Sequence, residues 1–365
     1  MRVVMVSKAF VVDAYQRKCE LMAEADPGLA LTLVTPPSWR WGARVSTFKP
    51  AHVRGYTVVV APIALNGNFH LHWYRGLGEL LQRLKPDIAH IDEEPYNLAT
   101  WLAFRAARSA GARPLFFTWQ NLARAYPPPF RWFERSVMND ARWALAGNAA
   151  AAAVIGAKGY RGPTSIVPQF GVDENLYRPA AERAPGRFVV GYAGRLDPEK
   201  GVDMLFEACA PLPDIDVQIA GAGPERERLL ALAERLGMAA RTRFLGSLDT
   251  PAMVAFYQGL NALVLPSRSR PNWVEQFGRV LIEAMACGVP VLGSRSGEIP
   301  NVIGDAGGLF PEGDVGALTD ALRALATSPA AAHAIGLRGR ERAVAHFSMR
   351  RIALETLQVY RSMLA

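Results

Sequence analysis

Short apolar runs alternate with helical patterns along the chain, and this alternation begins a second time after residue 187. Most of the runs are rich in β-branched residues, as in Arg2–Ser7 and Phe188–Ala193. Strands buried on both faces have this composition, and strands that alternate with helices form parallel sheets covered by helices. The sequence therefore predicts two α/β domains in succession.

The expected elements follow the same order in both halves. Strands are expected at Arg2–Ser7, Ala30–Thr35, Tyr56–Ala61, Ile88–Ile91, Pro114–Thr118 and 165–168, and then at Phe188–Ala193, Asp216–Ala220, Arg243–Gly246, Ala262–Leu265, Val289–Leu292 and Gly308–Phe310. Helices are expected at 13–25, 71–84, 97–110, 130–146, 202–210 and 349–363, with another ending near 236. The Ala-rich segment 149–157 is expected to be a helix or a region of close packing.

The chain has 365 residues, which exceeds what one hydrophobic core usually serves. The polar, Pro-containing segment 178–187 is typical of a linker. We therefore expect an N-terminal domain over 1–180 and a C-terminal domain over 181–347. Whether the final helix, 348–365, crosses back to the N-terminal domain is open. Ligands of such sheets bind at the carboxyl ends of the strands, so two Rossmann-like βαβ domains facing each other across a cleft are expected.

The positive charge of the chain is confined to its first half. Residues 1–180 carry 21 Lys and Arg against 13 Asp and Glu, whereas residues 181–365 carry 20 of each, so the whole net charge of +8 lies in the first half. Such a domain favours anionic partners: a membrane surface, a phosphorylated acceptor or nucleic acid. A mildly basic solvated surface is the alternative. Nucleic acid is not expected as a partner, because no nucleic-acid motif is present.

The cysteines and the apolar runs bear on the compartment. The three cysteines, Cys19, Cys209 and Cys287, are scattered and lack the spacing of metal ligands, which is typical of reduced thiols in a cytoplasmic protein. No signal peptide and no run of about 18 apolar residues is recognised. We expect a cytoplasmic protein, with peripheral contact on the inner face of the membrane as an open possibility.

The stretch Trp273–Pro290 carries two glutamates on either side of an expected helix start. Glu275 precedes Gly278, good helix formers follow it, and Glu283 lies inside the helix, which ends at Gly288. The unpaired N–H groups of a helix N-terminus suit phosphate. Two carboxylates flanking such an anion site would fit a nucleotide sugar. An amphipathic helix with two solvated glutamates is the alternative.

Two glycine-containing turns follow strands in the second half. Gly194 and Arg195 directly follow an expected strand, and Lys200 comes five residues after Arg195. A glycine lets the backbone approach a phosphate, and the two cations can clamp it. A pair of solvated basic residues is the alternative. Gly221-Ala-Gly223 lies in a similar position but is not a complete dinucleotide-binding fingerprint, and a tight turn explains it equally well.

Four motifs in this order resemble the retaining glycosyltransferases of family four, which have the GT-B fold. They are G-R-L-D-P-E-K-G from Gly194, G-A-G-P-E from Gly221, L-P-S-R from Leu265, and E-Q-F-G-R-V-L-I-E-A-M-A-C-G-V-P-V from Glu275. Together they extend over roughly residues 190–315. In the first half, P-D-I-A-H-I-D and V-P-Q-F-G-V-D match the family more loosely.

The resemblance implies roles for individual residues. Arg195 and Lys200 match the cations that neutralise the leaving diphosphate, Glu275 the residue that holds sugar hydroxyls, and Glu283 the residue that binds the ribose. The expected donor-binding residues are Gly194, Gly221, Glu225, Phe277, Gly278, Arg279 and Glu283. The expected catalytic residues are Arg195, Lys200, Glu275 and Asp92. Fixed positive groups suit this reaction because charge develops on the leaving group.

The first half departs from the family pattern in two places. Family members often carry H-x-H, whereas this chain has His90-Ile-Asp92, followed by Glu93 and Glu94. His90 is expected to be a buried core histidine or an acceptor-side residue, and the three acids either line the cleft or form a solvated loop. The first strand is followed by Lys8–Asp13 in place of a Gly-Gly pair. The expected acceptor-side residues are His90, Glu93, Glu94, Trp119, Gln120 and Asn121.

The resemblance implies a retaining hexosyltransferase that moves a sugar from a nucleotide-diphosphate-sugar to a hydroxyl of a saccharide or lipid-linked acceptor, in polysaccharide or glycoconjugate synthesis. The alternatives are transfer to a small soluble acceptor such as a sugar phosphate, and a non-catalytic nucleotide-sugar-binding partner. No cofactor and no metal are expected. Asp214-Ile-Asp216 is interpreted as a solvated turn, and His70 with His72 as structural packing in preference to a metal site.

Overall fold

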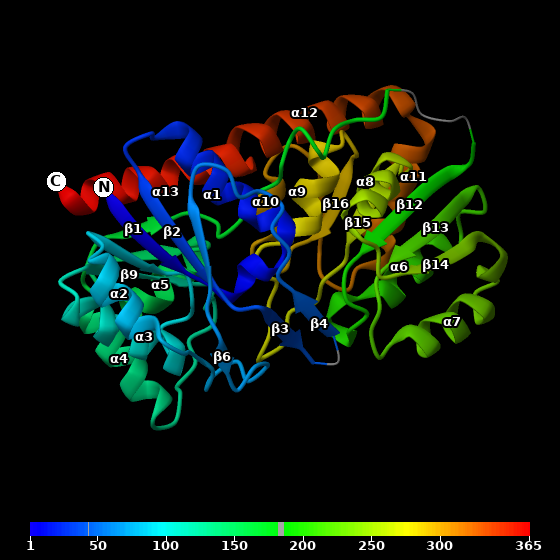
Figure 1. The fold of residues 1–365 in the computed structure, drawn as a ribbon. Helices are drawn as coiled ribbons and strands as arrows, with labels where there is room; N and C mark the ends of the chain where they lie inside the picture. The colour runs from blue at the N-terminus through cyan, green and yellow to red at the C-terminus, as the bar shows by residue number, and fades with distance from the viewer. Residues whose placement is uncertain (43, 182–185) are drawn as a thin grey trace. The chain divides into compact units, whose positions relative to one another are not determined.

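The computed structural model describes residues 1–42, 44–181 and 186–365, and these divide into two compact units. The first unit contains Met1–Gly171 and Met349–Ala365, and the second contains Val172–Ser348. Figure 1 shows the chain coloured from one terminus to the other. The final helix belongs to the first unit. Part of the expected linker, 182–185, lies outside the described residues.

The boundary between the units precedes the expected one at residue 180. The Val172 N–H donates to the Phe347 carbonyl over 2.9 Å, and Val172 forms a parallel bridge with Ser348. The outgoing and the returning chain are thus hydrogen-bonded together at the edge of the second unit. Because this pairing needs no turn or proline, the sequence pattern gave no signal of it.

The first unit is built on a parallel sheet of seven strands in the described chain, in the order β11-β10-β9-β8-β1-β2-β5. These strands are β1 (Arg2–Val6), β2 (Ala30–Thr35), β5 (Thr57–Val60), β8 (Ile88–Ile91), β9 (Arg113–Thr118), β10 (Trp143–Ala146) and β11 (Thr164–Ile166). Its α-helices are α1 (Asp13–Ala25), α2 (Leu77–Leu84), α3 (Leu98–Ser109), α4 (Phe130–Asp140), α5 (Ala149–Ala157) and α13 (Met349–Leu364). The chain order reverses between β1 and β8, which makes this pair the switch point of the sheet.

The second unit has a parallel sheet of six strands in the described chain, in the order β14-β13-β12-β15-β16-β17. These strands are β12 (Phe188–Ala193), β13 (Ile215–Ala220), β14 (Thr242–Gly246), β15 (Ala262–Leu265), β16 (Val291–Ser294) and β17 (Gly308–Phe310). The α-helices are α6 (Val202–Cys209), α7 (Arg226–Arg235), α8 (Thr250–Gln258), α9 (Arg279–Ala286), α10 (Ile299–Ile303), α11 (Val315–Thr327) and α12 (Pro329–Phe347). Here the switch point lies between β12 and β15.

Several elements differ from the expected ones. The helix expected over 130–146 ends at Asp140, and residues 143–146 form β10 instead. The helix expected from residue 71 begins only at Leu77, because β7 (Trp73–Tyr74) pairs with β6 (Ile63–Ala64) before it. A second hairpin, β3 (Ser38–Trp41) with β4 (Arg44–Thr47), was not expected. No helix within the described ranges is both long enough and apolar enough to cross a membrane.

Helix α13 is an integral part of the first unit's core. It packs against α1, and its residues Leu357 and Tyr360 are fully buried among side chains from β1 and β2. The Tyr360 hydroxyl lies 2.7 Å from His90 Nδ1 on β8. The sequence left the destination of this helix open, and burial of its apolar face determines it.

Replacing Leu357 with Ala is expected to destabilise the first unit by about 2–5 kcal/mol, because it leaves a cavity in the core. Leu354 on the same helix is 46% exposed. The same substitution there should change stability by less than about 0.5 kcal/mol. Urea denaturation followed by circular dichroism compares the two variants. Equal losses in both would show that α13 does not stabilise the unit through its buried face.

Candidate functional site

The switch point of the second unit brings two candidate residues together. Lys200 follows β12 and Glu275 follows β15, and the Lys200 Nζ lies 2.8 Å from the Glu275 Oε2. The hydroxyl of Ser267, which directly follows β15, donates to the same oxygen over 2.9 Å. The ammonium also lies 4.6 Å from the centre of a Trp273 ring. A cation and a carboxylate are therefore held in the crevice where such sheets bind ligands.

The loop that carries Glu275 is fixed through its backbone. The Glu275 carbonyl accepts a hydrogen bond from the Glu298 N–H over 3.0 Å. Gly297, with φ of 52°, approaches so closely that an added Cβ would lie 2.1 Å from the same carbonyl oxygen. No larger residue fits there without moving the loop. The position of Glu275 thus depends on the turn after β16 as well as on its own loop.

Helix α9 begins immediately after this loop, as expected. Gly278 precedes the helix with φ of 76°, a conformation that glycine adopts readily. Glu283 is buried inside the helix, and its carboxylate accepts a hydrogen bond from the Tyr257 hydroxyl at 2.7 Å and pairs with Arg279 at 3.0 Å. The alternative of two solvated glutamates is therefore wrong: Glu275 and Glu283 are 8% and 7% exposed.

The remaining donor-side candidates lie at the same edge of the sheet. Arg195 is exposed, and its guanidinium pairs with Asp197 over 2.8 Å. An added Cβ on Gly221 would lie 1.8 Å from the Gly194 carbonyl oxygen, so the turns after β12 and β13 are in backbone contact. The Glu225 N–H donates to the Leu196 carbonyl, and its carboxylate pairs with Arg228 at 2.6 Å. Phe277 is buried and packs edge-on against Phe347.

Three consecutive residues after β15 connect the neighbouring loops at this edge of the sheet. Besides Ser267, which binds Glu275, Arg268 pairs with Asp203 on α6 at 3.0 Å, and the Ser269 N–H and hydroxyl donate to Glu312 over 2.7 and 2.6 Å. Burial raises the pKa of Asp203, but Arg268 and Arg228 outweigh burial and hold it below its ordinary value. The loops after β15 and β17 and the start of α6 are thereby joined around the crevice.

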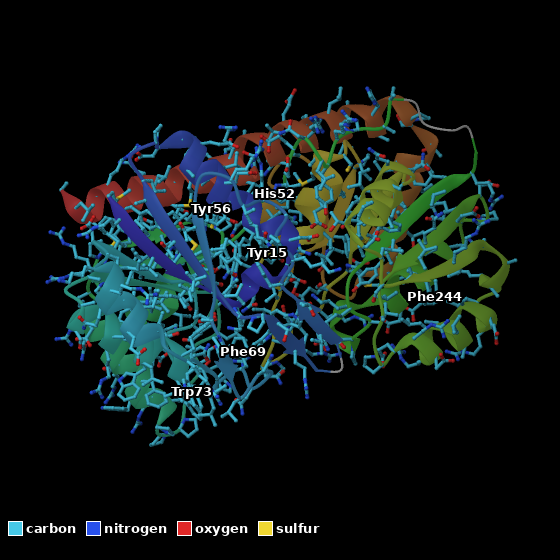
Figure 2. The ribbon with its side chains drawn as sticks, in the orientation of Figure 1. Tyr15, His52, Tyr56, Phe69, Trp73 and Phe244 are labelled. Atoms are coloured by element: carbon cyan, nitrogen blue, oxygen red, sulfur yellow. The ribbon has the colours of Figure 1, made fainter. Side chains whose placement is uncertain are left out.

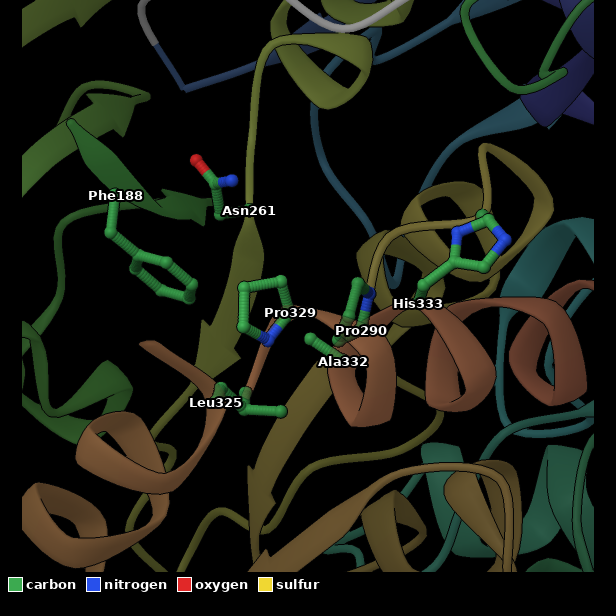
Figure 3. A pocket seen from close by; sticks show the side chains of 8 residues that line it. Phe188, Asn261, Pro290, Leu325, Pro329, Ala332 and His333 are labelled. Carbon is green, nitrogen blue, oxygen red and sulfur yellow. The ribbon is translucent and has the colours of Figure 1, made fainter. Parts of the chain in front are cut away.

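A small cavity in this unit lies at the opposite edge of the sheet. Its volume is about 110 Å³. Figure 3 shows residues that line it, among them Phe188 at the start of β12, Asn261 just before β15 and Pro290 just before β16. Because it lies at the amino ends of the strands, it is separate from the candidate site.

The switch point of the first unit holds a second lysine and glutamate. Lys8, after β1, pairs with Glu93, after β8, through its ammonium, and its N–H donates to the same carboxylate. The Tyr74 hydroxyl donates to Glu93 over 2.9 Å, and the Lys8 ammonium lies 4.6 Å from the centre of the Phe69 ring, which is labelled in Figure 2. Burial raises the pKa of Glu93, but the opposite effect of Lys8 and His72 is larger and holds this pKa well below its ordinary value.

His90 and Asp92 lie beneath this edge and are almost completely buried. His90 is 0% exposed and Asp92 is 2% exposed. Gln169 donates to the Asp92 carboxylate over 2.8 Å, and the buried Lys18 donates to the Gln169 carbonyl over 3.1 Å. Burial lowers the pKa of His90 well below its ordinary value, and it raises that of Asp92 although Lys18 opposes the shift. The burial of His90 agrees with its interpretation as a core histidine.

Glu94 connects the ends of β8 and β9. Its carboxylate accepts hydrogen bonds from the Thr118 hydroxyl at 2.7 Å and the Trp119 N–H at 2.8 Å. Gln120 is buried and donates to the Tyr126 hydroxyl over 3.0 Å, whereas Trp119 and Asn121 are half-buried. A solvated acidic loop at residues 92–94 is therefore wrong, because all three carboxylates have protein partners.

The histidines and acids with metal-like spacing have partners or surroundings of other kinds. His72 is buried against Trp39 at 4.8 Å between ring centres, which agrees with structural packing. Asp216 pairs with Arg187, while Asp214 is exposed. Among residues 1–42, 44–181 and 186–365, no group of three or more His, Cys, Asp or Glu side chains could hold a metal ion.

Residues 173–342 match the family model described as "Glycosyl transferases group 1". The second unit is thus similar to the group 1 glycosyl transferases. The match falls on the unit that holds Lys200, Glu275 and Glu283, and its limits nearly coincide with those of the unit.

Curated relatives of this chain match over part of their length. A D-inositol 3-phosphate glycosyltransferase of Mycolicibacterium paratuberculosis is 34% identical over 194 residues, which cover 49% of this chain and 43% of the relative. A GDP-mannose-dependent alpha-(1-6)-phosphatidylinositol monomannoside mannosyltransferase of Mycolicibacterium smegmatis is 34% identical over 208 residues. These cover 52% of this chain and 54% of the relative. The matched region thus spans about half the length of these relatives.

Solved structures resemble this chain over its whole length. Sucrose-phosphate synthase from Thermosynechococcus elongatus has a TM-score of 0.72 at 21% identity, covering 100% of this chain and 99% of the other. Anabaena HepE in complex with UDP and glucose has a TM-score of 0.72 at 19% identity, covering 99% and 100%. These likenesses concern the fold, and the expected GT-B fold with two Rossmann-like domains is confirmed.

Sequence reasoning missed several residues of both edges. In the second unit these are Ser267, Arg268 and Trp273, which lie inside or beside the quoted motifs, and Tyr257, which lies on a helix without any motif. In the first unit, Lys18 and Gln169 support Asp92 from positions far apart in the chain. Only the motif residues had a signal in the sequence, because the others are defined by packing.

Replacing Glu94 with Gln tests the environment of this carboxyl group. Burial raises the pKa of Glu94 from its ordinary value near 4.5 to about 7, although Trp119 and Thr118 oppose the shift. The folded protein therefore holds a proton that the unfolded chain has lost, and stability falls as the pH rises between these values. The variant should lose this pH dependence between pH 5 and 8, measured as the melting temperature in each buffer. A parallel loss of stability with pH in both proteins would contradict the assignment.

Proposed function

We propose that the protein is a retaining glycosyltransferase that moves a hexose from a nucleotide-diphosphate-sugar to a hydroxyl of a saccharide or lipid-linked acceptor, in polysaccharide or glycoconjugate synthesis. The observation that carries the proposal is the pairing of Lys200 with Glu275 in the switch-point crevice, directly before the N-terminus of α9. It places a cation, a helix N-terminus and a carboxylate in the order that a diphosphate and its sugar require.

In the proposed reaction, Lys200 and Arg195 neutralise the charge that develops on the leaving diphosphate. Glu275 accepts hydrogen bonds from hydroxyls of the transferred sugar, and Glu283 accepts them from the ribose. The leaving phosphate takes the proton of the attacking hydroxyl on the same face, so the configuration of the sugar is retained. No metal is assigned a part, because lysine, arginine and the helix N-terminus provide the positive charge. The test is the anomeric configuration of the product by proton NMR, and an inverted product would overturn the retaining mechanism.

Two other functions remain as alternatives. Transfer to a small soluble acceptor is favoured by the relative whose name specifies D-inositol 3-phosphate, whereas the mannosyltransferase named for a phosphatidylinositol monomannoside favours a lipid-linked acceptor. A non-catalytic nucleotide-sugar-binding partner would keep the binding residues without turnover. Release of nucleotide from a panel of donors, measured with and without each acceptor class, distinguishes the three.

A thermal-shift screen of UDP, GDP and ADP and of their sugars is expected to identify one base that raises the melting temperature. A ligand at a hundred times its Kd stabilises the folded state by about 2.7 kcal/mol. Lys200→Ala should remove most of this shift relative to its own ligand-free protein. Arg243→Ala, which replaces an exposed arginine on β14 of the same unit, should keep it. An undiminished shift in the Lys200 variant would overturn the donor assignment.

Glu283→Gln and Glu275→Gln should separate binding from turnover. A hydrogen bond to a charged group contributes about 1.5–3 kcal/mol, so each loss corresponds to roughly a 10- to 100-fold effect. Glu283→Gln is expected to raise the Kd of the nucleotide, and Glu275→Gln to lower kcat with little change in that Kd. Calorimetry and steady-state kinetics measure the two effects, and the opposite pattern would exchange the two roles.

A further inference from the structure

Helices α3 and α4 of the first unit present a face that is both cationic and aromatic. We define this arginine–tryptophan face by Leu102, Arg105, Arg131, Trp132 and Arg135, all of which are exposed. Trp132 is 55% exposed and Leu102 is 36% exposed, although both are large and apolar. The two helices pack side by side, as Figure 1 shows. A contiguous exposed apolar surface bordered by charge is typical of an interaction site.

The two helices contribute to one continuous surface. The rings of Trp101 on α3 and Trp132 on α4 lie 4.8 Å apart, and Arg105 covers the Trp101 ring at 4.9 Å. On α4, Arg131 and Arg135 are four residues apart and therefore lie on the same side of the helix, beside Trp132. The opposite side of α4, with Phe133 and Val137, is buried.

Few acidic residues lie near the arginines of this face. Residues 95–133 contain five arginines and no aspartate or glutamate. The next acid, Glu134, is 4% exposed and pairs with Lys158 at 2.7 Å, so it does not neutralise the surface. Within the described chain, Arg105, Arg131 and Arg135 form no ion pair with a carboxylate. The face therefore carries an uncompensated positive charge.

We infer that this face binds the surface of a bilayer that contains anionic lipid. Arginines attract anionic headgroups, and tryptophan with leucine inserts at the boundary between headgroups and acyl chains. Nucleic acid or an acidic protein would meet the charge, but neither accounts for the exposed Trp132 and Leu102. A lipid surface uses both properties of the face.

The face is continuous with the candidate acceptor segment. Trp119, Gln120 and Asn121 follow β9, and the chain then runs through Tyr126 and three exposed prolines, 127–129, into α4. Gln120 donates to the Tyr126 hydroxyl over 3.0 Å. A lipid-linked acceptor held in the bilayer would thus meet the segment at the carboxyl edge of the sheet. This link to the acceptor rests on the proposed function, whereas the binding of the bilayer does not.

Flotation with vesicles tests the inference on the full chain. The wild-type protein should float with vesicles of phosphatidylcholine and phosphatidylglycerol, less with phosphatidylcholine alone, and less at high salt. Arg131→Gln with Arg135→Gln should weaken the binding roughly tenfold. Arg83→Gln with Lys85→Gln, which removes the same charge from exposed positions at the end of α2, should leave it nearly unchanged. Equal losses of vesicle binding in both double variants would contradict binding through this face, because they would show that only the net charge of the protein matters.

Trp132→Ala tests the apolar part of the same face. It should weaken vesicle binding at high salt, whereas Trp41→Ala, at a position 45% exposed in β3, should not. No loss in the Trp132 variant, or stronger binding of a single-stranded oligonucleotide than of vesicles, would overturn the bilayer as the partner. Nucleotide thermal shifts are measured on all variants. A variant that loses vesicle binding but keeps its nucleotide thermal shift has lost only the function of the face. If the protein floats with vesicles but shows no nucleotide thermal shift, only the donor proposal fails.

Discussion

A buried or half-buried lysine–glutamate pair at the switch point is the interaction on which both units depend. At a switch point the connections of two neighbouring strands leave in opposite directions, so no backbone segment covers the edge and side chains fill the crevice. Lys8 and Glu93 fill it in the first unit, and Lys200 and Glu275 in the second. Removing one member of such a pair costs about 3–5 kcal/mol when the other charge stays buried. Each pair therefore constrains the loops on both of its sides.

The two pairs differ in their access to solvent, and this difference separates their roles. The side chains of Lys8 and Glu93 are 8% and 0% exposed, whereas those of Lys200 and Glu275 are 19% and 10% exposed. Tyr74 and His72 also contact Glu93, which adds to the enclosure. An anion can reach Lys200 by displacing one carboxylate oxygen, while Lys8 is sealed. The crevice of the second unit is thus suited to a ligand, and that of the first unit to structural support.

The sequence predicted the fold class and most strands because each run of apolar, β-branched residues is a local signal. The strand at 143–146 was missed, because Trp-Ala-Leu-Ala lacks β-branched residues and continues the helical pattern before it. The hairpin at residues 38–47 was missed because each of its strands has only four residues. For the site, the motifs predicted Lys200, Glu275 and Glu283 together. Tyr257, which binds Glu283, and Asp203, which pairs with Arg268, reach the site only through tertiary packing.

The burial of Asp92 changes how acceptor recognition has to be explained. Asp92 occupies the position where the family pattern led us to expect a histidine, but Gln169 and Lys18 enclose it, and burial favours its neutral form. Glu93 and Glu94 likewise have protein partners for their carboxylates. Asp92 and Glu93 are 2% and 3% exposed, against 8% and 7% for Glu275 and Glu283, so they are less accessible to a hydroxyl. Direct acceptor contacts are therefore expected from the half-buried Trp119 and Asn121, and the three acids act by fixing the strand ends that carry them.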